Sequence, residues 1–141
     1  MNLIWRHTDS RAQFPCILIS LLEQSAEEER PEALAFAQPY GDGRIVVFHD
    51  RVRQRAWPSL TPTLLGYVLA HEIGHILQGV ERHSDTGIMK SRWLYGDYKS
   101  MAMDRLSFTP EDAAMIRHGL EVRISRDSTT SPYHAGGAEG L

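Results

Sequence analysis

The chain has 141 residues, of which 42% are hydrophobic and 23% charged, so it is long enough for one domain with a buried core and too short for two. Its formal net charge of -3 at pH 7 excludes the basic surface of a typical nucleic-acid-binding protein. The single cysteine, Cys16, excludes an intramolecular disulfide and a zinc site built from several cysteines. A metal ion would therefore be held by His, Asp or Glu.

The sequence contains no membrane-spanning or export pattern. No stretch approaches the roughly 18 uninterrupted apolar residues of a membrane span, and residues 1–10 lack the basic start and apolar run of a signal peptide. We therefore expect no membrane partner and, for the chain as given, a cytoplasmic protein. If Met1 lies downstream of the true start, a missing signal peptide and secretion are expected instead. No pattern indicates the oligomeric state.

The first part of the chain predicts short strands. Apolar segments separated by charged, Pro-containing or Gly-containing stretches are residues 3–6, 17–22, 34–37 and 45–49. The last of these contains the unbroken apolar run Ile45-Val46-Val47-Phe48, which predicts a strand buried on both faces. The alternating Arg51, Arg53 and Arg55 that follow are expected on a solvated surface.

A long helix is predicted next. Thr61 and Pro62 supply an N-cap and a first-turn proline, and residues 64–77 follow with apolar side chains on every side of the helix. A helix that is apolar all round belongs inside the domain.

A second helix is predicted near the C-terminus. Thr109-Pro110-Glu111-Asp112 provides an N-cap, a first-turn proline and two carboxylates that suit a helix N-terminus. We expect this helix to run to about His118, before Gly119. Residues 125–141 are rich in Ser, Thr and Gly and are predicted to be a disordered tail, which leaves residues 1–124 as a single domain.

The sequence His71-Glu72-Ile73-Gly74-His75, within the first helix, carries the chemistry. Residues four apart share a helix face, so both imidazoles can reach one metal ion, while Glu72 is offset and can contact a metal-bound water. Buried without partners, such polar groups would each cost roughly 1 to 3 kcal/mol, and a metal removes that cost. Gly74 costs a helix about 1 kcal/mol relative to alanine, which indicates that something packs against the backbone there.

A catalytic zinc usually takes three protein ligands, so a third must come from elsewhere. Gly79 can end the helix and turn the chain back toward the metal. The candidates that follow it closely are Glu81, His83 and Asp85. Glu81 follows Gly79 too closely for the chain to reverse direction easily, whereas more residues separate His83 and Asp85 from Gly79.

This stretch resembles the metzincins, and among them the matrixins: HEIGH, a glycine turn, His-Ser, and then Gly-Ile-Met. The resemblance implies that His83 is the third ligand of one catalytic zinc ion and that Met89 is the methionine of the Met turn beneath it. The family pattern places the glycine three residues and the third ligand six residues after the second histidine. Here Gly79 comes four residues and His83 eight residues after His75, so the connection is longer.

The resemblance also implies an α+β fold, in which a small, mixed and twisted sheet packs on a buried active-site helix, followed by the Met turn and a C-terminal helix. Residues 107–116 resemble the start of the matrixin C-terminal helix. Residues 34–37 would be the edge strand that receives extended substrate. Metzincins usually begin with a strand and a helix for which this chain has no room, so we expect either an abbreviated fold with a shortened N-terminus or a Met1 that lies downstream of the true start.

The expected function is that of a zinc-dependent endopeptidase acting on a peptide or protein substrate, with Glu72 as the general base for a metal-activated water. One alternative is a non-catalytic zinc-binding pseudo-peptidase that acts as a binding module. Another is a gluzincin-like enzyme with a carboxylate further along as third ligand, such as Asp97, Asp104 or Glu111.

Other polar side chains have less specific roles in this interpretation. For Tyr95 and Tyr98 the sequence allows two roles: packing, or a hydrogen bond to a tetrahedral intermediate. Surface or packing roles are expected for the remaining histidines, which are His7, His49, His118 and His134.

Overall fold

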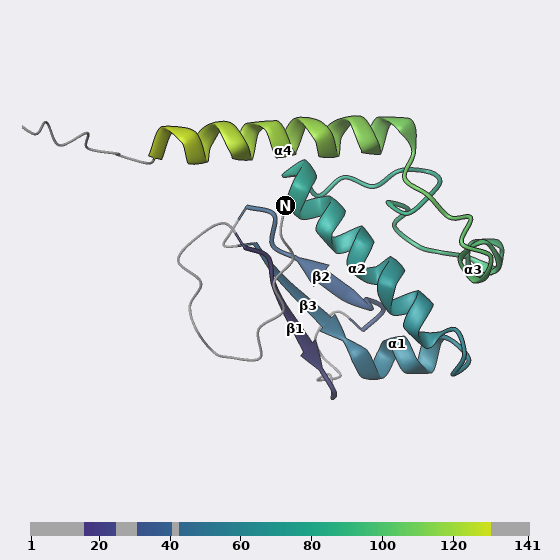
Figure 1. Ribbon diagram of the computed structural model, residues 1–141. Coiled ribbons are helices and arrows are strands. Elements are labelled where there is room, and N and C mark those ends of the chain that lie inside the picture. Colours follow the sequence, from purple (N-terminus) through teal and green to yellow (C-terminus); the bar gives the residue numbers. More distant parts are fainter. Residues whose placement is uncertain (1–15, 25–30, 41–42, 131–141) are drawn as a thin grey trace, which may run out of the picture.

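The computed structural model describes residues 16–24, 31–40 and 43–130 (Figure 1). Its elements in chain order are β1 (Leu18–Leu22), β2 (Ala35–Ala37), β3 (Arg44–Phe48), α1 (His49–Arg55), α2 (Thr61–Gln78), α3 (Tyr95–Ala102) and α4 (Pro110–Thr130). The α+β class is as predicted. The strand expected at residues 3–6 lies outside the described residues. Within the described ranges, none of the helices has the length and apolar character that crossing a bilayer would require.

The three strands form one mixed sheet in the order β1-β3-β2. β1 runs parallel to β3, and β2 runs antiparallel to it. Ile45, Val47 and Phe48 of the central strand β3 are fully buried, as the unbroken apolar run predicted. The sheet therefore has a buried centre, and β2 is an edge strand of the described sheet.

The outer edge of β2 is paired with no further strand among the described residues. The Phe48 amide donates to the Leu34 carbonyl and the Gln38 amide to the Arg44 carbonyl, each at 2.9 Å. Hydrogen-bonding direction alternates along an antiparallel strand, so the N–H and C=O groups of Ala35 and Ala37 point away from β3. These groups can pair with an added strand.

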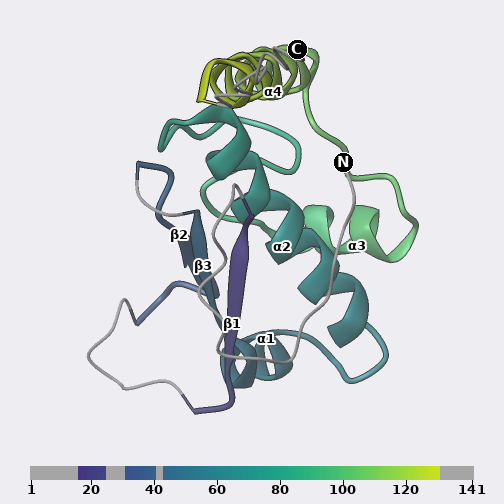
Figure 2. The same ribbon diagram turned by 60° about the vertical axis from the view of Figure 1, so that its left-hand side comes forward.

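Helix α2 lies between the sheet and α4, as both views of the molecule show (Figures 1 and 2). Its buried side chains Leu64, Val68 and Ile76 join Ala35 and Ala37 of β2 and Ile45 and Val47 of β3 in one core. The two alanines are small, which lets α2 approach the edge strand closely. The all-round apolar pattern of residues 64–77 thus marks a helix covered on opposite sides.

Helix α1 was not expected from the sequence, where Arg51, Arg53 and Arg55 suggested only a solvated surface. Tertiary contacts explain the helix. Val52 is fully buried, and the Arg51 guanidinium lies 4.2 Å from the centroid of the Phe48 ring. Arg51 also donates a 3.0 Å hydrogen bond to the Ala33 carbonyl, which ties α1 to the segment that leads into β2. Arg53 and Arg55 are exposed, as predicted.

Helix α4 is longer than predicted, because Gly119 does not end it. A Cβ atom at Gly119 would overlap the Leu77 carbonyl oxygen of α2, so glycine is required here for close contact between the two helices. Beyond it, Arg123 donates a 2.6 Å hydrogen bond to the Ile76 carbonyl. The helix continues through residues 125–130, which the sequence assigned to a disordered tail, while residues 131–141 lie outside the described residues.

Candidate metal centre

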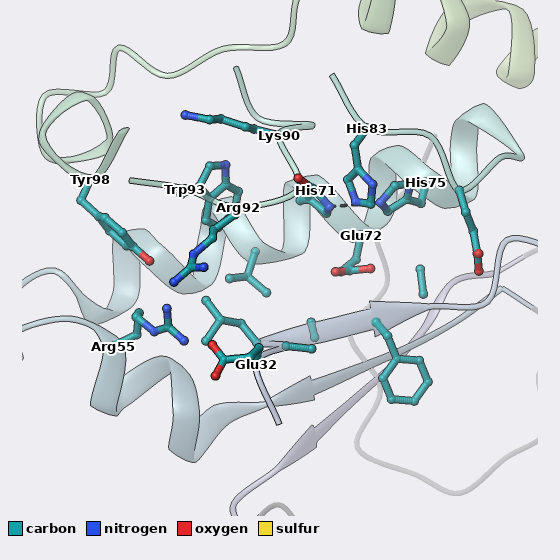
Figure 3. A pocket seen from close by; sticks show the side chains of 18 residues that line it. Glu32, Arg55, His71, Glu72, His75, His83, Lys90, Arg92, Trp93 and Tyr98 are labelled. Atoms are coloured by element: carbon teal, nitrogen blue, oxygen red, sulfur yellow. Dashed lines mark hydrogen bonds between the residues drawn. The ribbon is translucent and has the colours of Figure 1, made fainter. Parts of the chain in front are cut away.

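Three histidines converge at one end of α2. His71 and His75 lie one turn apart on this helix and are both buried, while His83 comes from the following loop and is exposed. One ring nitrogen from each of the three lies within 4.8 Å of the others, close enough to hold a metal ion (Figure 3). The His83 ring lies edge-on to His75, with the ring centroids 4.9 Å apart.

Gly79 directs the chain from α2 toward His83. It adopts the left-handed conformation, with φ of 69°, and its amide donates to the His75 carbonyl at 2.9 Å. This is the helix ending that the sequence predicted. The longer connection to the third histidine is therefore accommodated in the loop, without displacing His83 from the other two imidazoles.

The protonation of the two buried histidines follows from their hydrogen bonds. His71 Nδ1 lies 2.7 Å from the Ile88 carbonyl and His75 Nδ1 lies 3.2 Å from the Val80 carbonyl. A carbonyl only accepts, so both Nδ1 atoms carry the proton and both Nε2 atoms present lone pairs. These Nε2 atoms are 3.0 Å apart. Two lone pairs at that distance repel each other, and a cation between them would remove the repulsion.

Burial keeps these imidazoles neutral. It lowers the pKa of His71 to about 4, outweighing the Ile88 hydrogen bond, and the neighbouring His75 and His83 lower it further. Burial also lowers the pKa of His75, against the effect of its hydrogen bond to Val80. Neutral imidazoles are the form that binds metal, so the site is ready for a cation at neutral pH.

Glu72 lies beside this group without belonging to it. Its side chain is only 7% exposed, and its carboxylate points into the same pocket as the three imidazoles (Figure 3). It follows His71 directly, so the helical turn offsets it from the histidine stripe. A carboxylate in this position can accept a proton from a molecule held at the metal.

Met89 packs against α2 at Gly74, between the two helical histidines. Met89 is fully buried, and a Cβ atom at Gly74 would come within 2.5 Å of its sulfur and 3.3 Å of the Phe108 ring. This is the close approach to the helix backbone that a glycine between the two ligands predicted. The Ser84 amide donates to the Met89 carbonyl at 2.9 Å, so the turn that carries Met89 is joined to the segment that carries His83.

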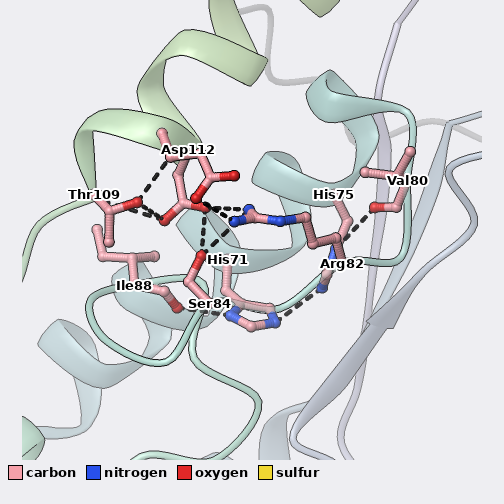
Figure 4. A network of polar contacts seen from close by, with 9 residues as sticks. His71, His75, Val80, Arg82, Ser84, Ile88, Thr109 and Asp112 are labelled. Carbon is pink, nitrogen blue, oxygen red and sulfur yellow. Dashed lines mark hydrogen bonds and ion pairs between the residues drawn. The ribbon is translucent and has the colours of Figure 1, made fainter.

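A buried carboxylate, Asp112, joins the His83 loop to α4 (Figure 4). It is fully buried and accepts hydrogen bonds from Ser84 Oγ at 2.6 Å and from Arg82 Nη1 at 2.9 Å. Burial opposes its charge, but these bonds and those from Thr109 outweigh burial and hold the pKa of Asp112 below its usual value. Arg82 and Ser84 flank His83, so Asp112 fixes the loop on both sides of the imidazole.

The same carboxylate caps α4. The Asp112 amide donates to Thr109 Oγ1 at 3.1 Å, and Asp112 Oδ2 accepts from the Thr109 amide at 3.2 Å. This reciprocal pair is a capping box and confirms Thr109 as the N-cap. The sequence indicated that this carboxylate suits the helix N-terminus. It did not indicate the second contact of Asp112, which is with Ser84, 28 residues earlier in the chain.

The centre opens into a pocket of about 330 Å³ that runs along β2. One wall is the segment from Glu32 to Ala37, and α2 contributes Val68, His71, Glu72 and His75. The remaining wall comes from α1, from the loop between α2 and α3, and from α3, through Arg55, Glu81, Lys90, Ser91, Arg92, Trp93 and Tyr98. The indole of Trp93 meets the His71 ring edge to face, with the ring centroids 5.6 Å apart.

The other candidate residues lie elsewhere or have other partners. Within the described residues, the three histidines form the only group of metal-ligand spacing, and no carboxylate joins them. Asp97 accepts from Lys90 and from the Leu94 amide, each at 2.7 Å, at the start of α3, and Glu111 pairs with Arg82 at 2.8 Å. Tyr98 lines the pocket, whereas Tyr95 is 74% exposed.

Two of the remaining histidines are described, and neither belongs to the histidine group. His49 pairs with Glu23 at 3.0 Å, and His118 is exposed on α4. His7 and His134 lie outside the described residues.

Known proteins add no independent assignment. Comparison of the chain with protein-family models, with curated proteins and with solved structures gave no match. The resemblance to metzincins therefore rests on the sequence pattern from His71 to Met89 alone.

Proposed function

We propose that this chain is a zinc-dependent endopeptidase of the metzincin type. The observation that carries the proposal is the convergence of His71, His75 and His83 beside the buried carboxylate of Glu72. A structural zinc site is usually closed by four protein ligands. Three ligands beside a carboxylate favour a catalytic site instead.

The donor set suits zinc. Neutral imidazole nitrogens are common zinc ligands, with Zn–N distances near 2.0 to 2.1 Å and tetrahedral geometry. Two such bonds place the ligand nitrogens roughly 3.3 Å apart, and the Nε2 atoms of His71 and His75 are 3.0 Å apart. Three histidines leave one coordination position for water or substrate.

Glu72 would perform the proton transfers. The bound ion would supply a water of lowered pKa and a polarised scissile carbonyl. Glu72 would take a proton from the attacking water as the water oxygen bonds to the carbonyl carbon. It would then give this proton to the amine nitrogen as the C–N bond breaks, which would restore its carboxylate.

The edge of β2 would orient the substrate. Its outward N–H and C=O groups, at Ala35 and Ala37, line the same pocket as the histidines. An extended peptide paired with them would lie along the pocket with its main chain facing Glu72. Main-chain pairing would hold a peptide without requiring a particular side chain at each position.

The test is metal-dependent cleavage. Full-length protein carrying one zinc per chain is incubated with a mixture of unstructured peptides, and the products are identified by mass spectrometry. We expect internal cleavage that stops when a chelator removes the zinc and returns when zinc is restored. A zinc-loaded protein that cuts no peptide would support the non-catalytic binding module, and cleavage that survives metal removal would contradict the proposal.

A further inference from the structure

Two arginines lie at one end of the pocket. Arg55 comes from the last turn of α1, and Arg92 comes from the loop that follows Met89. Their guanidinium groups point toward one space, which the Tyr98 hydroxyl also faces, on the side away from His75 and His83 (Figure 3). Residues far apart in the sequence therefore bring two positive charges to one part of the pocket wall.

Neither arginine is neutralised within the described part of the chain. Lys90, which lines the same pocket, is paired with Asp97 at 2.7 Å, and Arg53 lies 3.8 Å from Glu23. Arg55 and Arg92 form no hydrogen bond or ion pair among the described residues. Glu32 lies at the same end and is exposed, but it makes no ion pair with either arginine.

Guanidinium groups that have no acidic partner among the described residues and that line a pocket attract an anion. Both arginines are exposed at the pocket wall, where two like charges at one place raise the local positive potential, and the planar guanidinium matches a carboxylate with two parallel hydrogen bonds. We infer that the Arg55–Arg92 pair binds a carboxylate of the bound peptide, an inference that rests on the proposed function. The two arginines are then specificity residues of the cleft.

The strand geometry places this carboxylate on the substrate. A peptide that pairs antiparallel to β2, the more frequent kind of strand pairing, would run from Ala37 toward Ala35, so its later residues would reach the end of the pocket where Glu32 and Arg55 lie. The carboxylate therefore belongs on the C-terminal side of the bond that faces Glu72. It can be an Asp or Glu side chain or the free C-terminus, and the experiment separates these two sources.

The first measurement is binding, which needs no turnover. Zinc-loaded, full-length Glu72→Ala protein is titrated with randomised peptide pools that differ at one fixed position, glutamate or glutamine. Each pool is made with a free or an amidated C-terminus. We expect binding about 10-fold tighter for the glutamate pool if a side chain is bound, or for the free-acid pool if the C-terminus is bound. The preference should weaken as salt is raised.

Variants assign the preference to these residues. The double variant Arg55→Gln/Arg92→Gln should bind acidic and neutral pools within about 2-fold of each other. Arg53→Gln is the matched control, because Arg53 lies in the same last turn of α1 but does not line the pocket. It should keep the full preference. Glu32→Gln should increase the preference, since it removes the negative charge at that end.

The outcomes separate this inference from the proposed function. Equal binding of all pools, or a preference that survives in the double variant, overturns the carboxylate site. Zinc-loaded wild-type protein is then tested for cleavage of the same pools. Absence of cleavage together with arginine-dependent binding overturns the peptidase and supports the carboxylate site. Cleavage without an acidic preference in either assay overturns the carboxylate site alone.

Discussion

Asp112 accepts a 2.6 Å hydrogen bond from Ser84, the residue that directly follows His83. The bond joins the first turn of α4 to the loop that carries the third histidine. It makes the position of an exposed imidazole depend on a fully buried carboxylate. The charge and hydrogen bonds of Asp112 should therefore affect both folding and metal binding.

Asp112→Asn should lower the free energy of unfolding at pH 7 by about 2 kcal/mol, because it removes the charge that Arg82 and the hydroxyls of Ser84 and Thr109 satisfy. Zinc affinity should fall about 10-fold as the His83 loop loosens. Denaturant unfolding and zinc titration measure the two effects. Glu111→Gln is the control, since its exposed carboxylate pairs with the same Arg82 and should change stability by less than about 1 kcal/mol. Equal effects of the two variants would contradict the role of Asp112.

The contribution of Asp112 should depend on pH. Its folded-state pKa lies below the ordinary value of 3.8, so the stabilisation is complete above about pH 4 and is lost as pH falls through the folded pKa. The stability difference between wild type and Asp112→Asn should thus be constant from about pH 5 to 7 and shrink below pH 4. Unfolding curves of both proteins in chelator, across this range, measure it. A difference that grows in acid would show that Asp112 is not a stabilising carboxylate.

His83→Ala should weaken zinc binding by more than about 100-fold, because it removes one of three ligands. Asp85→Ala should change the affinity by only a few-fold, about the effect of a distant surface charge, since Asp85 is exposed and outside the histidine group. Competition with a chromophoric chelator measures both affinities side by side. Loss of zinc from Asp85→Ala alone would assign the third ligand to the carboxylate.

Two glycines that look alike in the sequence should respond oppositely to alanine. Gly119→Ala should destabilise the protein by at least about 2 kcal/mol, because its Cβ would overlap the Leu77 backbone where α4 crosses α2. Gly66→Ala in α2 should stabilise it by roughly 0.5 to 1 kcal/mol, since its Cβ meets no atom within 4 Å and alanine favours the helix. Thermal unfolding of the two variants compares them directly. If Gly119→Ala were as stable as wild type, the packing of α4 on α2 would be wrong.

Patterns of neighbouring residues in the sequence predicted the central strand, the start of α4 and the pairing of two histidines on α2. The unbroken apolar run at Ile45 to Phe48 became the central strand, and the proline and capping pair at Thr109 started α4. The HExxH spacing needed only helical geometry to bring His71 and His75 together. Gly74 showed, through its cost to a helix, that something packs between them.

Tertiary contacts decided what the sequence could not show. Helix α1 has a single buried residue, Val52, and α3 a single one, Met101, so neither carries an amphipathic period. Gly119 looks like a helix end until α2 is placed against it. Asp112 has its role through the contact with Ser84, and Arg55 lies in the same pocket wall as Arg92. These residues are far apart in the sequence, so no local pattern could predict that they come together.

Proton transfer by Glu72 at a metal held by three histidines is the central claim, and Glu72→Gln tests it most directly. The amide keeps the size of the side chain but cannot take a proton, so zinc content should stay at the wild-type level. The measurement is the rate of peptide cleavage at equal zinc occupancy. A rate about 100-fold to 10,000-fold below wild type is predicted. Cleavage by zinc-loaded Glu72→Gln at the wild-type rate would contradict the claim.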